Sequence, residues 1–324
     1  MSEKDYYKVK AISNSSLNLL ETSPRKFYKF YNQELEEEKE AYFKQGSAIH
    51  CYILEPKEFS KRFKFLDYVT PNSPNKKQFI EAYLKAKGKE EDKLIKAYKA
   101  SYSTTSDETA LTKAKELKEE LKSYFKYLEY ENNGIGVFPF HFKSLLQDIK
   151  KELEKNNKAK ELLFTQPTEF DELYIFNELP IFWDMKKEDS VYSCKAMLDR
   201  VVIDKKEKII KLVDLKTTSN IFEFSSKSFF DYHYDRQLAF YSIAIMEFFK
   251  DKFAEDNIEE YTIEHYIVAI SKVDPEARVF KISENIVLNA AQQITKLLDR
   301  VHWHFINDKW EYSVEQYTDG YEII

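Results

Sequence analysis

Two stretches rich in β-branched and aromatic residues, Val191–Ile203 and Lys208–Leu215, are separated by four polar residues. Strand-forming runs joined by such a short polar segment predict a β-hairpin with its turn at Asp204–Glu207. We expect Ile203 to pair with Ile210 across this turn. This register determines which side chains meet farther along the two strands.

The predicted register also pairs Val201 with Leu212 and places Asp199 opposite Asp214. Because strand side chains alternate between faces, Lys216 lies on the same face as Asp214. Two carboxylates beside an ammonium group could hold Mg²⁺ or Mn²⁺ against a phosphate. The alternative is a structural ion pair at the strand ends, because such pairs create similar clusters.

The sequence around Asp214 favours the metal site. Asp214 follows the apolar run Ile209–Val213, as expected of a residue at the point where a buried strand reaches the edge of its sheet. An acid in that position is costly unless something pairs with it.

The composition excludes several classes of protein. The chain has 324 residues, enough for one large domain or two small ones, and 43% of them are hydrophobic. Only 5 glycines are present, and no glycine-rich phosphate-binding loop occurs. The two cysteines, Cys51 and Cys194, supply neither a disulfide framework nor a four-cysteine metal site. No apolar run approaches the ~20 residues of a membrane span. We therefore expect a cytoplasmic protein that does not contact a membrane.

The distribution of residue types predicts a mixed architecture. We expect helices at residues 13–32 and 45–54, and a helical insertion at about 75–165 that breaks at Ser101–Asp107 and Asn132–Gly136. Beyond the hairpin, the expected strands and helices are Asp171–Asn177, Ile181–Asp184, Tyr234–Phe249, Tyr261–Ser271, Arg278–Ile282 and Glu284–Phe305. We predict an α/β (α+β) fold with a central mixed sheet flanked by helices. One domain would span residues 1–324, with N-terminal helices at 11–56 and the α/β core at about 168–310.

Other residues stand out singly. His50 lies in an apolar helical stretch, where it is either a packed core residue or a ligand. Glu172 is either an exposed strand acid or part of the site. Gln237 and Tyr241 share one helix face because they are four residues apart.

The chain carries a formal net charge of −6, which does not indicate a nucleic-acid binder. An acidic enzyme can still line one channel with Lys and Arg, and a bound metal adds positive charge. Arg25, Lys26 and Lys29 form a small basic patch, suited either to phosphate contact or to solubility.

Several motifs occur in a definite order along the chain. They are Ile12–Leu17 with Ser23-Pro24, Gly46-Ser-Ala-Ile-His50 with Leu54-Glu-Pro56, Glu172, Leu198-Asp199-Arg200, Val213–Thr218, and Gln237 with Tyr241 after Tyr234. Over about residues 11–245 this series resembles the RecE-type exonucleases of the PD-(D/E)XK nuclease superfamily, which also includes lambda exonuclease and the RecB nuclease domains.

The resemblance implies roles for these residues. Asp199, Asp214, the Leu215 carbonyl and His50 would bind Mg²⁺ or Mn²⁺, and a nitrogen ligand suits Mn²⁺ somewhat better. Lys216 would position or deprotonate the attacking water. Glu172 would orient water or a second metal, and Gln237 and Tyr241 would hold Lys216 or the DNA backbone. The residues expected to contact DNA are Arg25, Lys26, Lys29, Arg200, Thr217, Thr218 and Arg236.

The resemblance also implies an activity. The protein would be a metal-dependent exodeoxyribonuclease that degrades double-stranded DNA from an end, 5′ to 3′, in phage-type recombination inside a bacterial host. It would hand the exposed strand to a single-strand annealing protein and could form a ring. The alternatives are a structure- or site-specific endonuclease of the same superfamily and a non-catalytic DNA-binding protein on a decayed nuclease fold.

Overall fold

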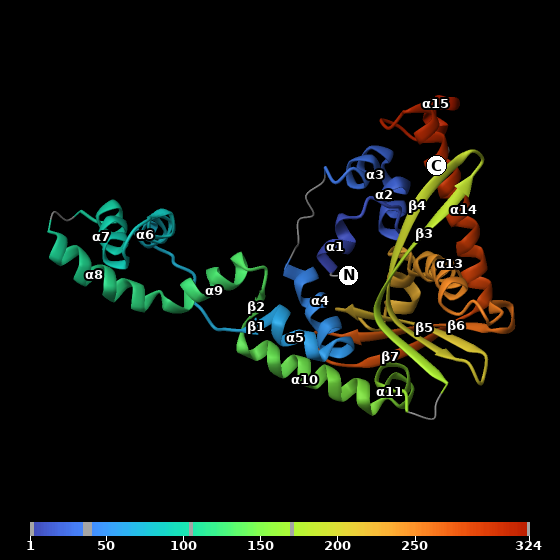
Figure 1. Cartoon of the computed structure of the whole chain (residues 1–324), viewed down its shortest axis with the longest axis horizontal. Coiled ribbons are helices and arrows are strands. Elements are labelled where there is room, and N and C mark those ends of the chain that lie inside the picture. Colours follow the sequence, from blue (N-terminus) through green and yellow to red (C-terminus); the bar gives the residue numbers. More distant parts are fainter. Residues whose placement is uncertain (1–2, 35–40, 104–105, 169–171, 323–324) are drawn as a thin grey trace. The chain divides into compact units, whose positions relative to one another are not determined.

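The chain folds into two compact units. The computed structural model describes residues 3–34, 41–103, 106–168 and 172–322 (Figure 1). Unit 1 comprises Met1–Pro56 and Gln147–Ile324, and unit 2 comprises Lys57–Leu146. The compact helical unit thus begins and ends earlier in the chain than the insertion expected at about 75–165.

A five-stranded mixed sheet forms the centre of unit 1. Its strands follow one another in sequence order, and only β5 and β6 run parallel. Their bounds are β3 Leu173–Lys187, β4 Ser190–Asp204, β5 Ile209–Thr218, β6 Thr262–Ser271 and β7 Ala277–Ile282. The predicted mixed α/β class is confirmed. The expected strands Asp171–Asn177 and Ile181–Asp184 belong to one long strand, β3, although Asp171 lies outside the described residues.

The predicted hairpin register is confirmed. Ile203 pairs with Ile210 and Val201 with Leu212, so β4 and β5 meet as their alternating apolar residues require. Val201 and Leu212 belong to the main core, which places one face of these strands against α13 (Tyr234–Lys252).

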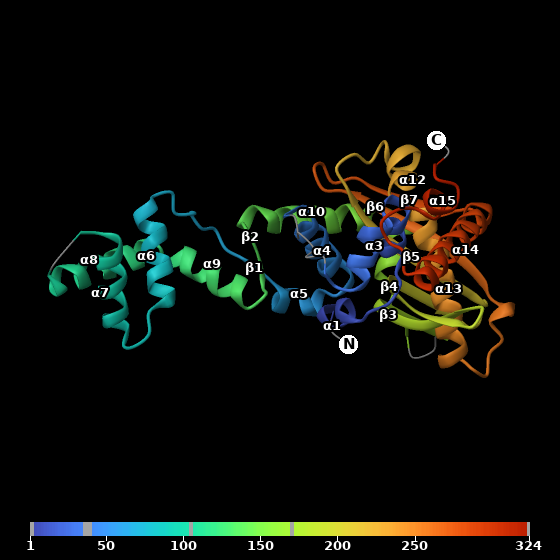
Figure 2. The same ribbon diagram turned by 90° about the horizontal axis from the view of Figure 1, so that it is seen from above.

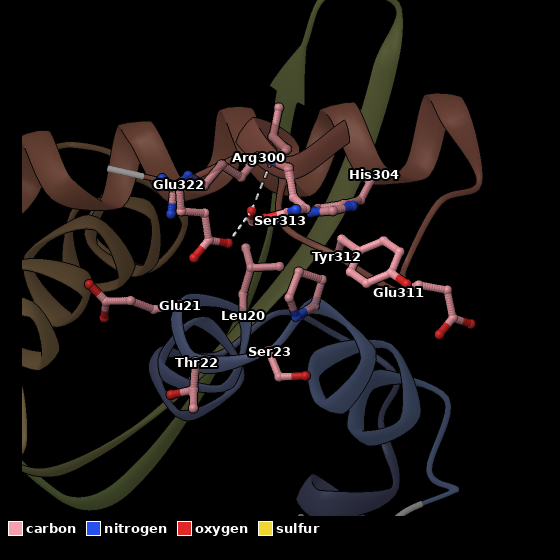
Figure 3. A pocket seen from close by; sticks show the side chains of 13 residues that line it. Leu20, Glu21, Thr22, Ser23, Arg300, His304, Glu311, Tyr312, Ser313 and Glu322 are labelled. Carbon is pink, nitrogen blue, oxygen red and sulfur yellow. Dashed lines mark hydrogen bonds between the residues drawn. The ribbon is translucent and has the colours of Figure 1, made fainter. Parts of the chain in front are cut away.

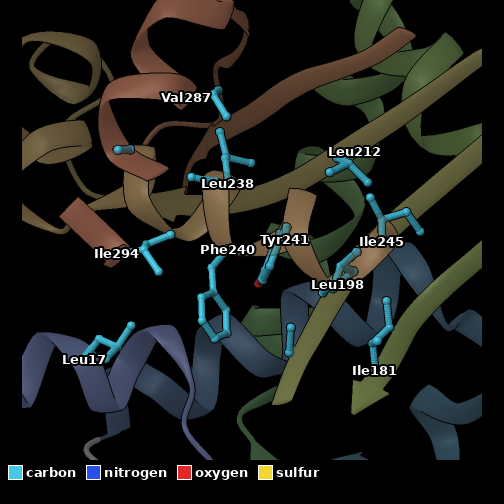
Figure 4. Close-up of a cluster of buried hydrophobic side chains, with 14 of the residues drawn as sticks. Leu17, Ile181, Leu198, Leu212, Leu238, Phe240, Tyr241, Ile245, Val287 and Ile294 are labelled. Carbon is cyan, nitrogen blue, oxygen red and sulfur yellow. The ribbon is translucent and has the colours of Figure 1, made fainter. Parts of the chain in front are cut away.

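Two long helices cover that face of the sheet. α13 connects β5 to β6 and packs on β3, β4 and β5, while α14 (Glu284–Asn307) packs against α13 (Figure 2). Their apolar faces meet strand residues in one continuous core (Figure 4). Representative members of this core are Leu17, Ile181, Leu198, Leu212, Leu238, Phe240, Ile245, Val287 and Ile294.

The helix expected at residues 13–32 is two helices, α2 (Asn14–Thr22) and α3 (Pro24–Tyr31). Pro24 disfavours a helical conformation at Ser23, which is extended with φ −165° and ψ 114°. The Ser23 hydroxyl then accepts a hydrogen bond from the amide of Lys26 and caps α3. A serine followed by proline therefore ends one helix and starts the next.

α4 (Ala41–Leu54) packs against β4 and β5. α10 (Phe140–Lys155) leads from unit 2 into unit 1, where α11 (Asn157–Phe164) follows. The remaining short elements of unit 1 are α1 (Glu3–Lys8), the π-helix η1 (Phe224–Ser228), α12 (Phe229–Asp231), η2 (Ile258–Glu260) and α15 (Val314–Thr318).

Buried arginines tie helices to this framework. On β4, Arg200 is 1% exposed and donates hydrogen bonds to the carbonyls of Leu162 and Thr165 and to the side chain of Asn177. This binds the end of α11 to β3 and β4. On α13, Arg236 is fully buried and donates to Asn18 and Glu21 of α2.

Unit 2 is mostly helical and has its own core. Its helices are α5 (Pro56–Arg62), α6 (Pro74–Lys85), α7 (Glu90–Ser101), α8 (Asp107–Glu120) and α9 (Lys122–Asn132). Phe79, Leu94 and Leu117 are buried among α6, α7 and α8. Two short parallel strands, β1 (Phe63–Phe65) and β2 (Gly136–Phe138), pair with each other. The breaks predicted at Ser101–Asp107 and Asn132–Gly136 are confirmed.

No helix within the described ranges is long and apolar enough to cross a membrane.

The contacts of Arg200 predict a structural role. Arg200→Met keeps much of the side-chain length but leaves two carbonyls and one amide oxygen without their donor. We expect the free energy of unfolding to fall by about 2 kcal/mol or more. Arg25→Met is the matched control, because Arg25 is exposed and its change should stay within about 0.5 kcal/mol. Urea denaturation of both variants measures the difference, and equal stabilities would contradict the role assigned to Arg200.

A buried histidine predicts a pH dependence of stability. Burial lowers the pKa of His265 on β6 to about 4, and its Nε2 lies 2.6 Å from the Ser242 hydroxyl. Below pH 6.5 this histidine is protonated in the unfolded chain but stays neutral in the folded chain. The free energy of unfolding therefore decreases as the pH falls from 6.5 toward 4. In His265→Asn, the decrease in the free energy of unfolding between pH 7 and pH 4 should be smaller than in the wild type, by up to about 3 kcal/mol. Denaturation of both proteins between pH 7 and 4 tests this, and parallel pH profiles would contradict it.

Candidate active site

The site begins where two strands separate. The last backbone pair between β4 and β5 is Arg200 with Val213, one residue before Asp199 and Asp214. Beyond it, β4 continues beside β3 and β5 continues beside β6. The amide of Leu215 donates to Asp199 Oδ2 at 2.8 Å. A carboxylate therefore occupies the place where the strands part.

Asp214 and Lys216 are in direct contact. Lys216 Nζ donates to Asp214 Oδ1 at 2.9 Å and lies 2.8 Å from Oδ2. Asp214 is only 1% exposed, and its Oδ2 has no hydrogen bond of good geometry within the described part of the chain. This oxygen is paired with the Lys216 ammonium, and its remaining lone pair can bind a metal ion.

The electrostatics of these groups reflect burial and mutual contact. Burial, opposed by Lys216, raises the pKa of Asp214 to about 6, and the charge of Asp199 adds to the increase. Burial likewise raises the pKa of Asp199, more than Lys216 and the Leu215 amide lower it. For Lys216, burial disfavours the ammonium, but Asp214 and Asp199 together outweigh it and raise the pKa. The raised pKa favours the charged, ammonium form of Lys216.

The side chain of His50 on α4 lies close to Asp199. Its Nδ1 lies 3.6 Å from Asp199 Oδ2. One ligand atom each from His50, Glu178 and Asp199 lie within 4.8 Å of one another, a spacing that could accommodate one metal ion. The helix that carries His50 packs on β4 and β5, which is why this residue reaches the strand fork.

Glu178, rather than Glu172, lies in the cluster. Glu172 is exposed just before β3, where Leu173 pairs with Asp204 at the turn end of β4, roughly 17 Å of strand from Asp199. Glu178 sits between Asn177 and Leu179, whose partners on β4 flank Asp199. The expectation for Glu172 is therefore corrected: the structure does not bring it to the site.

The backbone at Glu178 has an unusual conformation. Its φ is +47°, and no β4 partner is paired with it in an otherwise regular ladder. Such an irregular position can redirect a side chain. The sequence contained only a weak signal, the Leu179-Pro180 pair that interrupts two strand-like runs, and this reads equally well as a break between strands.

The Leu215 carbonyl is also well placed. In a strand, the N–H and C=O of one residue point to the same edge. Since the Leu215 amide points to Asp199, its carbonyl faces the same gap.

Three residues of α13 border the lysine and the acids. Gln237 Nε2 donates to the Tyr241 hydroxyl at 2.5 Å, as their shared helix face predicts. Burial, Asp214 and Asp199 raise the pKa of Tyr241 well above its ordinary value, so it stays protonated beside the carboxylates. The ring of Tyr234, whose role was not predicted, lies 4.9 Å from Lys216 Nζ.

The residues expected to contact DNA divide into two groups. Arg200 and Arg236 are buried with all their described contacts to protein, so the expectation of DNA contact is wrong for both. Thr218 is also buried, and its hydroxyl bonds with the backbone of Asn220. Thr217 is partly buried beside Gly46 of α4, where an added Cβ would lie 3.5 Å from its hydroxyl.

The basic patch of α3 remains accessible. Arg25 and Lys26 are exposed and Lys29 is partly exposed, with Arg25 3.6 Å from Glu311. These three residues keep their status as candidates for phosphate contact.

A pocket of about 230 Å³ lies between α2–α3 and α14–α15 (Figure 3). It is lined by groups of both charges, among them Glu21, Arg300 and Glu311. None of the predicted site residues lines it, so it is separate from the acidic cluster.

The cluster fits a divalent cation. Carboxylate and carbonyl oxygens with one imidazole form a donor set that accepts Mg²⁺ or Mn²⁺, with the nitrogen favouring Mn²⁺. The burial of both Asp199 and Asp214 is a second observation, because two buried carboxylates beside one ammonium leave negative charge that a cation can offset.

Comparisons with known proteins agree with this geometry. A family model of the PD-(D/E)XK nuclease superfamily matches residues 11–318. A crystal structure named "Putative exonuclease", from Eubacterium rectale, aligns with 100% of this chain and 94% of that chain, with 12% identity and a TM-score of 0.53, a likeness that shows the fold alone. The structure of SSO0001 covers 69% of this chain and 84% of its own, with 13% identity and a TM-score of 0.25. The search of curated proteins returned no match.

The family match includes all five strands of the sheet and every residue of the acidic cluster. This chain therefore belongs to the PD-(D/E)XK nuclease superfamily.

Proposed function

We propose that this protein is a divalent-metal-dependent exodeoxyribonuclease that hydrolyses double-stranded DNA from an end, 5′ to 3′. The observation that carries the proposal is the buried contact of Asp214 with Lys216 beside Asp199. Members of the superfamily use divalent metals, and the arrangement of acids at the strand fork supports the same chemistry here.

The proposed ligands are Asp199, Asp214, Glu178, His50 and the Leu215 carbonyl. A divalent cation, when bound, lowers the pKa of its water and screens the charge of a scissile phosphate. Asp199 is held in place by the Leu215 amide, so its orientation is set before any ligand arrives.

Lys216 is proposed to act by charge. A lysine that serves as a base needs a lowered pKa, whereas the carboxylates raise the pKa of Lys216. Its ammonium would position the attacking water and offset the charge that develops on the phosphate. Tyr241, kept protonated and joined to Gln237, would hold the lysine side of the site in place.

The biological setting is part of the proposal. The motif series that resembles RecE-type enzymes supports phage-type recombination in the bacterial cytoplasm, with a single-strand annealing protein as partner and a homo-oligomeric ring as the assembly. The name of the Eubacterium rectale protein also contains the word exonuclease.

The activity is tested with linear duplex DNA labelled at the 5′ or 3′ end, beside a covalently closed circle. We expect Mg²⁺ or Mn²⁺ to support loss of the linear DNA with early release of the 5′ label, and EDTA to abolish it. The circle should stay intact. Asp214→Asn should reduce the rate by about a thousandfold or more, because it removes a proposed ligand and the partner of Lys216.

Asp184→Asn is the matched control. Asp184 also precedes a lysine by two residues, but it is exposed on β3 and accepts from Ser193, so its variant should retain activity. Cleavage of the closed circle would contradict the proposal and show that the protein is an endonuclease. A folded wild type without hydrolysis in either metal would leave a non-catalytic DNA-binding protein.

The two glutamates give a second test. Glu178→Gln removes one carboxylate from the cluster with little change in shape, and we expect Mn²⁺ to bind about tenfold more weakly or worse. Glu172→Gln should leave the affinity unchanged. Calorimetric titration of Mn²⁺ into each variant measures the constants, and the reverse order would restore Glu172 to the site.

A further inference from the structure

Three aromatic side chains are exposed on the connection between β5 and α13. Phe222 is 69% exposed, Phe230 is 50% exposed and Tyr232 is 62% exposed. This connection follows directly from the strand that carries Asp214 and Lys216. Three large exposed rings on one short segment need an explanation, because such surfaces commonly mark binding sites.

Buried aromatic side chains and hydrogen bonds hold this segment in place. Phe224 and Phe229 are buried, and the ring of Phe224 stacks on that of Phe280 in β7 at 5.5 Å. The Asn220 side chain accepts hydrogen bonds from the amides of Phe222 and Glu223, at 3.1 and 3.3 Å. The exposed rings therefore stand on a fixed backbone, which reduces the entropy lost when they bind.

One of the three exposed rings, that of Tyr232, is linked to the candidate site. The Tyr232 ring lies 5.8 Å from that of Tyr234, which in turn lies 4.9 Å from Lys216 Nζ. The ring of Phe222 has a separate contact, because the guanidinium of Arg278 lies 4.6 Å from it. A group resting on Tyr232 would thus be two rings from the lysine.

The charges around the rings limit what they could bind. Glu223 and Asp231 lie on the same segment as Lys227, and Arg278 is paired with Glu276, so the surface has no excess of cations for phosphates. The flat face of a nucleobase is uncharged and stacks on aromatic rings whatever the base. This favours a base over the sugar–phosphate backbone as the occupant.

We propose that Tyr232, with Phe230 and Phe222, stacks on unpaired bases of the strand that enters the candidate site. The inference rests on the proposed nuclease function and specifies its substrate as a strand already separated from its complement near the scissile bond. Bases inside a duplex are stacked on both sides, so an internal base pair offers no face to this surface.

The test compares two single strands of roughly 20 nucleotides, one of thymidylate and one with abasic sites throughout, in EDTA to prevent hydrolysis. Fluorescence anisotropy gives both dissociation constants. Tyr232→Ala should weaken binding of the thymidylate strand by about tenfold and leave the abasic strand nearly unchanged. Tyr232→Trp should restore tight binding. Tyr312→Ala removes a similarly exposed ring after α14 and should change neither constant.

Equal effects of Tyr232→Ala on both strands, or no effect on either, would overturn the inference. A change in oligomeric state on sedimentation of this variant would also overturn it, in favour of a second copy of the chain as the occupant. Wild-type hydrolysis of linear DNA is measured in parallel. If the wild type does not hydrolyse linear DNA, the proposed function is refuted. If it does, but its binding does not depend on the bases, only the stacking surface is refuted.

Discussion

The separation of β4 from β5 at Asp199 and Asp214 underlies the rest of the site. A backbone amide that loses its strand partner must find another acceptor, because a buried N–H without one is costly. The Leu215 amide finds it in the Asp199 carboxylate. One side chain therefore both completes the strand and presents an oxygen to the gap, so the fold cannot lose Asp199 without leaving a backbone group unsatisfied.

Burial of two carboxylates in this gap opposes folding. The raised pKa values of Asp199 and Asp214 show that their ionised forms are disfavoured there, even with Lys216 in contact. One ammonium cannot neutralise two carboxylates, and a divalent cation would supply the missing charge. The balance resembles other functional sites, where local instability is retained because a ligand relieves it.

The sequence predicted what depends on local alternation and failed where tertiary contacts decide. The register Ile203–Ile210 follows from apolar residues with period two, and it alone brings Asp199 near Asp214. Glu178 could not be preferred to Glu172, because the sequence does not show the pairing of β3 with β4 that places Glu178 opposite Asp199, nor its positive φ of +47°. Arg200 and Arg236 were predicted to be surface cations that contact DNA. Each instead donates hydrogen bonds to protein acceptors that only tertiary packing brings within reach.

The net charge of the whole chain conceals how its charges are distributed between the two units. The whole chain has 50 Lys and Arg against 56 Asp and Glu, but residues 57–146 alone have 18 against 13. The negative excess therefore belongs to unit 1, where part of it lies in the acidic cluster itself. Carboxylates that bind a cation do not repel a phosphate as free ones do, because the metal reverses the local sign of the charge. A total of −6 is thus compatible with a polyanionic substrate, because the acids of the cluster count toward that total and would draw the phosphate in through the metal.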